Sequence, residues 1–228
     1  MTKNAIPAST EAVDDYLKAI LELSGPGDAR VTSNALAGHL GIRAASVTGM
    51  LQKLAALETP FVAYEKHRGV RLSPAGRCRA LEVIRHHRLL ERFLHDVLDY
   101  SWDEVHEEAE RLEHYISERL EDRIAARLGD PSLDPHGHAI PGKNGVVAER
   151  VEVELSRWPC DVPGAVSSVS DRDPAALREM KKLGLVPGAT VLIAPGSRAG
   201  SVLVSIGGQP AARVTPEIAA GVLVGAKA

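Results

Sequence analysis

The sequence predicts a mainly α-helical protein with a winged helix-turn-helix domain, a second helical domain and, at its end, a small all-β barrel of roughly SH3 size. Two short helical stretches around a glycine, followed by a basic hairpin signal, are typical of a winged helix. Two long stretches of helical periodicity come next. Short β-type runs split by Gly and Pro then predict the barrel. The expected domain boundaries are 1–73, 74–145 and 146–228.

Length and composition exclude several classes of protein. The 228 residues, with 44% hydrophobic and 25% charged side chains, are ordinary for a globular protein of more than one small domain. The two cysteines, Cys78 and Cys160, are too far apart for a CxxC zinc site and too few for a disulfide framework. The opening segment MTKNAIPAST lacks an apolar signal region, and no apolar run is long enough to span a bilayer. We therefore expect a soluble, cytoplasmic protein without a membrane partner.

The net charge of −3 hides an asymmetry along the chain. From Arg30 to Arg88 there are ten Lys/Arg against three Asp/Glu, whereas from Glu91 to Arg123 there are four against twelve. A basic block followed by an acidic one suggests a surface for a polyanion next to a site for a cation.

A first amphipathic helix is expected from Glu11 to Leu23, because apolar residues recur there at helical spacing before the breaker SGPGD. Asp15 lies early in this helix, where the helix dipole favours a carboxylate whatever its function. A second helix is expected to begin at a Ser33 or Asn34 cap and to run to about Leu40.

After a turn at Gly41, a third helix from about Ala44 to Leu57 would be the reading helix of a helix-turn-helix. The candidates for base and phosphate contacts at its amino-terminal end are Arg43, Ala45, Ser46, Thr48 and Gly49. The next stretch, FVAYEKHRGVRL, alternates as a hairpin and places Lys66 and Arg68 at its tip, where a wing meets the phosphate backbone. The alternatives are an ordinary helical hairpin and a surface hairpin that happens to be basic.

Two longer helices follow, Pro74–Leu98 and Glu104–Leu128, and each carries His and Glu at spacings that share one helix face. The candidate metal ligands are His87 and Glu91 on the first, and His106, Glu110, Glu113 and His114 on the second. Mixed oxygen and nitrogen donors suit a divalent transition ion, and two such helices can converge on a pair of sites. The alternatives are a solvated acidic helix face and an exposed His–Glu pair.

Residues 129–145 are rich in Pro and Gly and mark a domain boundary. Their His136 and His138 receive no role, because an HGH loop without nearby carboxylates is more often simply polar. The stretch from Val146 is expected to be a strand or a tether before the β-type runs, which one helix over PAALREMKKLGL interrupts. Asp171 and Asp173 precede that helix; capping is the simpler role for each, and reaching a metal site in the adjoining domain is the other.

Together these segments resemble the diphtheria toxin repressor family of metal-dependent iron and manganese regulators. The resemblance covers nearly the whole chain and rests on the segments AASVTGMLQKL, YEKHRGVRLSPAGR, RHHRLLERFL, VHEEAERLEH, HGHAIPG and MKKLGLVPG. It implies a homodimeric, metal-activated repressor that binds double-stranded operator DNA. It also implies that the helical domain after the wing is the dimerisation domain and that the terminal barrel is SH3-like.

The resemblance further implies two metal sites. The main site of the family maps onto Asp15, Glu110, Glu113 and His114, with His87 added in the manganese branch. A second site maps onto His87, Glu91 and His106, with a ligand from the terminal domain at Asp173 or Asp171.

Two departures from the family bear on the metal. Asp15 and Glu110 stand where iron-type members have methionine and cysteine, and hard oxygen ligands favour manganese. Lys18 stands where the small manganese regulators have a second glutamate, which counts against their closely spaced two-manganese arrangement. We expect a Mn²⁺-responsive regulator of metal-homeostasis genes, with Fe²⁺ as the alternative and other divalent transition metals binding in vitro.

Two other classes of protein stay open at this point. The first is a metal-dependent hydrolase, but the sequence contains no HExxH motif, nucleophile elbow or P-loop that would support this class. A metal-independent winged-helix protein with a ligand-sensing barrel would lack the two metal sites.

Overall fold

The computed structural model describes residues 11–25, 27–196 and 201–226; the polar opening segment, residues 1–10, lies outside them. The chain forms two compact units. The first runs to His86 and takes in Pro141–Gly145, and the second holds His87–Ile140 and the chain from Val146 onward. The division falls inside the long helix α4 (Pro74–Leu98), whose bounds match the prediction.

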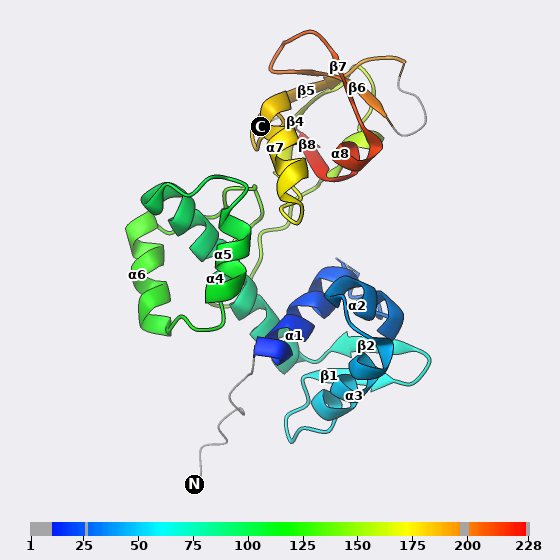
Figure 1. Ribbon diagram of the computed structural model, residues 1–228, viewed down its shortest axis with the longest axis vertical. Coiled ribbons are helices and arrows are strands. Elements are labelled where there is room, and N and C mark those ends of the chain that lie inside the picture. Colours follow the sequence, from blue (N-terminus) through cyan, green and yellow to red (C-terminus); the bar gives the residue numbers. More distant parts are fainter. Residues whose placement is uncertain (1–10, 26, 197–200, 227–228) are drawn as a thin grey trace. The chain divides into compact units, whose positions relative to one another are not determined.

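The first unit is a winged helix, as predicted (Figure 1). Its elements before α4 are α1 (Glu11–Ser24), α2 (Ser33–Leu40), α3 (Ala44–Ala55), β1 (Val62–Glu65) and β2 (Gly69–Leu72). The cap of α2 lies one residue earlier than expected, because the Thr32 side chain accepts a hydrogen bond from the Ala35 amide. Gly41 ends α2 with a left-handed φ of 65°, which glycine adopts without strain.

The hairpin β1–β2 is held in place by the chain that precedes α2. Val31 and Val70 exchange two backbone hydrogen bonds of 2.9 Å, so Val31 extends the small sheet beside β2. Gly69, with φ of 96°, passes so close to Val31 that a Cβ would lie 2.5 Å from the Val31 carbonyl oxygen. Only glycine therefore allows the wing to dock here, and the exposed tip from Lys66 to Arg68 projects from a fixed base.

A buried ion pair joins α1 to the start of α4. Arg79 donates from Nε to Asp14 Oδ1 at 2.8 Å and from Nη2 to Asp14 Oδ2 at 2.6 Å, and the Asp14 side chain is 1% exposed. These hydrogen bonds raise the pKa of Arg79 further above its ordinary value, against the effect of burial. Asp14 thus fixes α1 in the first unit, whereas the neighbouring Asp15 lies on the rim of a pocket.

The second unit begins with the end of α4 and adds α5 (Val105–Leu112) and α6 (Glu118–Leu128). The prediction of one helix from Glu104 to Leu128 was wrong. Ser117 has extended backbone, and its side chain accepts a hydrogen bond from the Leu120 amide, so it caps a new helix. Between the two helices, Glu113 retains helical dihedrals at the end of α5 but leaves the regular helix, with its side chain fully buried.

Replacing Ser117 with alanine is expected to destabilise the protein by about 1 kcal/mol, because α6 loses the acceptor for one of its free amide groups. Thermal unfolding of the full-length protein measures this change. Ser117→Asp is the matched control, since it restores an acceptor at the same place and should unfold close to the wild-type temperature. Equal stability of the alanine and aspartate variants would contradict the assignment of the cap.

The remainder of the second unit is a small β domain, as predicted. Its sheet has the order β3-β8-β4-β5-β6-β7, and all five pairings are antiparallel. Its elements are β3 (Val153–Glu154), η1 (Leu155–Arg157), β4 (Pro163–Val169), α7 (Pro174–Leu183), β5 (Thr190–Ile193), β6 (Val202–Ile206), β7 (Ala212–Val214), α8 (Pro216–Ala220) and β8 (Val222–Ala226). Short α8 was missed in the sequence, although Thr215 caps it and Pro216 occupies its first turn.

Trp102 connects the two parts of the second unit. It lies between α4 and α5, yet its side chain is buried in the core of the β domain with residues such as Leu155 and Leu177. Its indole Nε1 donates to the Pro135 carbonyl at 3.0 Å, and Arg178 on α7 pairs with the adjacent Asp103 at 2.7 Å. The helices and the β domain of this unit are therefore packed on each other. None of the described helices has the length and apolar character needed to cross a bilayer.

Candidate metal centre and nucleic-acid interface

Glu91 lies at the centre of a buried cluster of histidines. Its side chain is 0% exposed, and its Oε1 lies 3.0 Å from His87 Nε2, 3.3 Å from His106 Nδ1 and 3.6 Å from His136 Nδ1. Burial alone would raise the pKa of Glu91, but the charge of His87 and the contacts with His106 and His136 outweigh it and hold that pKa well below the ordinary value. The cluster thus contains a fixed carboxylate charge surrounded by imidazole nitrogens.

Asp171 adds a second carboxylate from the β domain. It follows β4, and its Oδ2 lies 3.6 Å from His106 Nδ1 and 3.6 Å from His138 Nδ1. Burial opposes its ionisation, but His138 and His106 lower the pKa of Asp171 below the ordinary value. Ligand atoms of His87, Glu91, His106 and Asp171 all lie within 4.8 Å of one another. Two carboxylates and two imidazoles at this separation suit a divalent transition ion.

The predicted ligand Asp173 lies elsewhere. Its side chain accepts a hydrogen bond of 2.8 Å from the Ala175 amide and caps α7, and the residue is exposed. The structure thus separates the two aspartates that the sequence had left as alternatives. Asp171 belongs to the cluster, whereas Asp173 has the capping role that the sequence offered for both.

A second group of carboxylates surrounds the other nitrogen of His87. Its Nδ1 is in contact with buried Glu113 and lies 3.8 Å from Glu110 Oε1, and His114 Nε2 lies 3.6 Å from Glu113 Oε1. A neutral imidazole has a lone pair on one nitrogen only, so His87 can ligate on one side while it donates a proton on the other. Three of the four residues predicted for the main site are thus close together, and the fourth, Asp15, lies on α1 in the first unit, so its membership stays a prediction.

The HGH loop, which the sequence left without a role, docks between the helices and β4. Asp134 builds it, because its Oδ1 accepts hydrogen bonds from the amides of His136 at 2.8 Å and His138 at 2.9 Å. The His136 carbonyl accepts from the Val169 amide of β4 at 2.9 Å. The signal in the sequence is the alternating spacing of Asp134, His136 and His138, which supplies the nearby carboxylate that the HGH loop had seemed to lack.

The residues predicted to contact DNA differ in their exposure to solvent. Arg43, Ala45 and Ser46 are exposed at the start of α3, and Lys66 and Arg68 are exposed at the tip of the wing. Thr48 and Gly49 are half-buried, and the Thr48 hydroxyl donates to the Ala44 carbonyl at 3.1 Å within the helix. Arg68 forms an exposed ion pair of 3.0 Å with Glu65, which leaves it accessible to phosphate. Among these candidates, the exposed basic side chains are the ones that a DNA phosphate could reach most directly.

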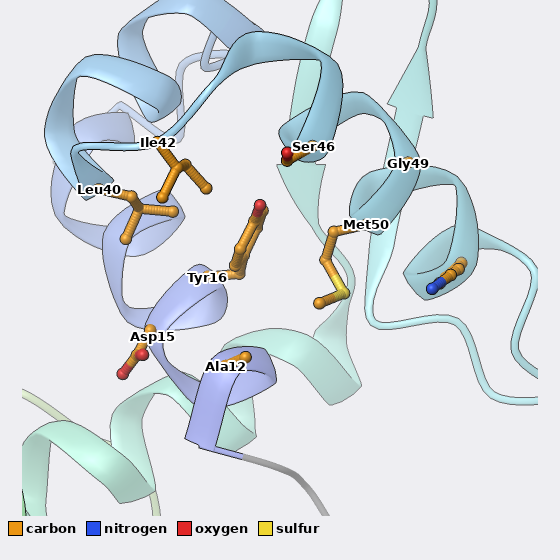
Figure 2. Close-up of a pocket in the computed structure, with 9 residues that line it drawn as sticks. Ala12, Asp15, Tyr16, Leu40, Ile42, Ser46, Gly49 and Met50 are labelled. Carbon is orange, nitrogen blue, oxygen red and sulfur yellow. The ribbon is translucent and has the colours of Figure 1, made fainter.

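A mainly apolar pocket of about 420 Å³ separates α1 from the reading helix. Figure 2 shows Tyr16 of α1 between Leu40 and Ile42 on one side and Met50 of α3 on the other. Asp15 lies at its edge, with its carboxylate directed away from the Tyr16 ring (Figure 2). Asp15 thus borders the pocket, while its carboxylate points away from the apolar side chains that face the reading helix.

Comparisons with known proteins agree with this architecture. Family models match in succession along the chain: the DNA-binding domain of the iron dependent repressors at residues 9–70, their metal binding and dimerisation domain at residues 73–142, and the FeoA domain at residues 153–225. The iron-dependent repressor IdeR of Mycobacterium tuberculosis is 31% identical over an alignment that covers 94% of this chain and 96% of that protein.

Manganese regulators are also similar to this chain. The regulator MntR of Geobacillus kaustophilus is 36% identical over 109 residues, which cover 47% of this chain and 74% of that protein. A solved manganese-dependent transcriptional repressor in complex with manganese superposes with a TM-score of 0.85 at 37% identity, covering 94% of this chain and 99% of that one. The chain therefore belongs to the iron-dependent repressor family, which includes the diphtheria toxin repressor and consists of metal-dependent DNA-binding transcriptional repressors rather than enzymes.

Proposed function

We propose that this repressor responds to manganese and, in its metal-bound form, represses metal-homeostasis genes as a homodimer on palindromic double-stranded operator DNA in the cytoplasm. The oxygen-rich ligand set of the main site is the observation that supports Mn²⁺ as the activating metal. Glu110 and Glu113 flank His87, and Asp15 is the proposed third carboxylate ligand. Mn²⁺ prefers such hard ligands, whereas a thiolate would favour softer ions. Fe²⁺ is the alternative activator.

Asp15 is the proposed link between metal and DNA. It lies on α1, which packs against α2 and β2 beside the reading helix, whereas Glu110, Glu113 and His114 belong to the second unit. A ligand set drawn from both units would restrict the first unit to one orientation. The DNA-competent orientation is then favoured to the extent that it binds the ion more tightly than the others do.

Exposed apolar residues support the proposed dimer. Leu112, Tyr115 and Leu120 are 37%, 73% and 46% exposed, and all three lie between the end of α5 and the first turn of α6. Large apolar side chains grouped in this way mark interaction surfaces. A second copy of the chain packed here would present two reading helices, related by two-fold symmetry, to two operator half-sites. We propose the division into domains 1–73, 74–145 and 146–228 because three family models match in succession at residues 9–70, 73–142 and 153–225.

A titration of DNA binding tests the proposed function. A palindromic duplex selected from a random pool is titrated with full-length protein in chelator and then in Mn²⁺, Fe²⁺, Co²⁺ or Zn²⁺, with fluorescence anisotropy as the readout. Mn²⁺ is expected to tighten binding by about 5- to 150-fold, the range of ordinary allosteric coupling. Equal affinity in chelator and in Mn²⁺ would contradict the proposal, and a response to Fe²⁺ alone would support the alternative metal.

Glu110→Ala provides the matched variant for this titration. Glu110 is part-exposed, so its removal is expected to leave the thermal unfolding temperature nearly unchanged while the response to Mn²⁺ is lost. An unchanged Mn²⁺ response would remove Glu110 from the activating site. Calorimetry that detects no Mn²⁺ binding would instead favour a metal-independent winged-helix protein.

A further inference from the structure

We propose that Arg30 is a positioning residue for the wing: it holds and neutralises Glu65, so that Arg68 can exchange its ion pair with Glu65 for one with a DNA phosphate. Glu65 thus occupies Arg68 until DNA is bound. This role rests on the proposed contact of the wing tip with DNA, and it adds to that contact a residue that does not touch DNA itself. The hydrogen bonds among the three side chains and the unequal exposure of the two arginines support it.

Glu65 is an acidic residue in a basic part of the wing. It ends β1, directly before the exposed tip residues Lys66, His67 and Arg68. A carboxylate and a phosphate repel each other, so an uncompensated carboxylate here opposes DNA binding. The Glu65 side chain is 42% exposed, so burial does not remove it from the field of the DNA. Its charge has to be balanced by neighbouring side chains if the wing is to contact a phosphate.

The two oxygens of this carboxylate bind two different arginines. Arg30 donates from Nη2 to Glu65 Oε1, and Arg68 donates from Nη1 to Glu65 Oε2 at 3.0 Å. The turn at the tip favours the second contact, because the Arg68 amide donates to the Glu65 carbonyl at 3.0 Å and His67 has a left-handed φ of 67°. One carboxylate is therefore shared between a guanidinium from the chain before α2 and a guanidinium from the tip.

Arg30 is fixed to the base of the wing by further contacts. Its Nη1 donates to the Gly69 carbonyl at 3.2 Å, and the next residue, Val31, exchanges two backbone hydrogen bonds with Val70. Glu65 and Gly69 face each other at the ends of β1 and β2, so Arg30 contacts both strands where the hairpin turns. Its side chain is 25% exposed. Arg30 thus stays with Glu65 whatever the tip does.

Arg68 is much less constrained than Arg30. Its side chain is 77% exposed, and an ion pair as exposed as this one contributes little to stability. A phosphate offers the guanidinium two acceptor oxygens and a stronger charge-assisted contact. Arg68 can therefore leave Glu65 for DNA at small cost, while Arg30 continues to balance the carboxylate. Without Arg30, Glu65 would either retain Arg68 or face the phosphate uncompensated.

A double-mutant cycle in the full-length protein tests this role, with DNA affinity measured by fluorescence anisotropy. Arg30→Gln is expected to weaken binding by about three- to fivefold, the range of one ion pair near the surface. Glu65→Gln should bind at least as tightly as the wild type, because the carboxylate that competes for Arg68 is gone. The double variant should return to within about twofold of the wild type, since no charge at Glu65 remains to be neutralised.

The sign of the effect at Glu65 is decisive. If Glu65 only held the hairpin together, Glu65→Gln would weaken DNA binding and the double variant would bind more weakly than either single variant. That result would overturn the proposed role of Arg30. Glu65→Gln alone decides the sign even if a variant of Arg30 fails to fold.

The salt dependence of binding distinguishes a phosphate contact from a positioning residue. Arg68→Gln is expected to reduce the slope of log affinity against log salt concentration by about 0.9, the value for one phosphate contact. In the Glu65→Gln background, Arg30→Gln should leave this slope unchanged. A slope reduced there as much as by Arg68→Gln would make Arg30 a direct DNA contact and would contradict its positioning role.

Arg30→Lys separates the charge of Arg30 from its hydrogen bonds. Lysine keeps a positive charge beside Glu65 but lacks the planar fork that reaches Glu65 and Gly69 together. It is expected to bind DNA within about twofold of the wild type, less than the loss of a whole ion pair. A loss as large as that of Arg30→Gln would show that docking of the wing, and not neutralisation of Glu65, sets the affinity.

A duplex of random sequence distinguishes a failure of this role from a failure of the proposed function. Non-specific binding depends on phosphate contacts, so at low salt the cycle can be measured whether or not Mn²⁺ is the activator. If Arg68→Gln changes neither the affinity nor the salt slope on this duplex or on the operator, the wing contact and the role of Arg30 are both incorrect. The Mn²⁺ response of operator binding, tested with Glu110→Ala, stands or falls separately.

Discussion

Asp14→Ala is expected to destabilise the first unit by about 1.5–3 kcal/mol, because it removes two charge-assisted hydrogen bonds and leaves the part-buried Arg79 with its second partner, Glu82. Asp14 accepts two hydrogen bonds from the Arg79 guanidinium at 2.8 and 2.6 Å and is almost fully buried. Truncating one member of such a pair costs more than the pair itself contributes, since the remaining charge is only partly rehydrated. Urea unfolding of the full-length protein, followed by circular dichroism, measures the loss.

The adjacent Asp15 is the matched control for Asp14. Asp15→Ala removes the same functional group from the next position of α1 and is expected to cost less than about 1 kcal/mol, the range for a carboxylate near a helix start. It should nevertheless abolish the Mn²⁺ response of operator binding. If the two variants unfold at the same urea concentration, the division between a structural Asp14 and a metal-binding Asp15 is incorrect.

Gly137→Ala is expected to displace the HGH loop and to cost about 2–5 kcal/mol. Glycine adopts the φ of 91° found here freely, whereas a left-handed alanine costs about 1–2 kcal/mol. In addition, a Cβ at this position would overlap the Ser167 carbonyl oxygen and lie 3.0 Å from Ser168 Cα, both backbone atoms of β4. The loop would have to move away from β4, and overpacking of this kind adds about 1–3 kcal/mol.

Gly188→Ala is the control that separates backbone strain from overlap with β4 in the loss of stability expected for Gly137→Ala. Gly188 has a similar φ of 86°, but a Cβ there would meet no atom within 4 Å, so only the backbone strain remains. Thermal unfolding should therefore show a larger loss for Gly137→Ala than for Gly188→Ala, and only the former should weaken Zn²⁺ binding at the Glu91 site. Equal losses would show that the loop accommodates the extra methyl group.

The winged helix and the β domain were predictable because local patterns specify them. Hydrophobic periodicity, the turn at Gly41 and the basic hairpin each determine structure within a few residues, and the bounds of α1 and α3 differ from prediction by at most two residues. The break before α6 was missed for an equally local reason. One Ser117 cap outweighs the helix propensity of the surrounding Glu, Arg and Leu, and propensity summed over a window does not register it.

The metal cluster was only partly predictable, because helical spacing brings together residues of one helix and not residues of different elements. His87 with Glu91, and Glu110 with Glu113, follow from spacing along α4 and α5. The choice of Asp171 over Asp173, and the approach of His136, depend on how the HGH loop docks against β4. That docking requires the long-range contact between Gly137 and Ser167, which no periodicity encodes.

The ligands around Glu91 come from parts of the chain that are far apart in sequence. His87 lies on α4, His106 on α5, and Asp171 follows β4. An ion held by these residues is therefore a reversible cross-link that closes a long loop, and cross-links of this kind stabilise chiefly by restricting the unfolded chain. With these proposed ligands, metal availability would set the resistance of the β domain to local unfolding as well as the occupancy of an operator. In a metal-starved cell the same loss of ions that releases the DNA would also expose this part of the repressor to proteolysis.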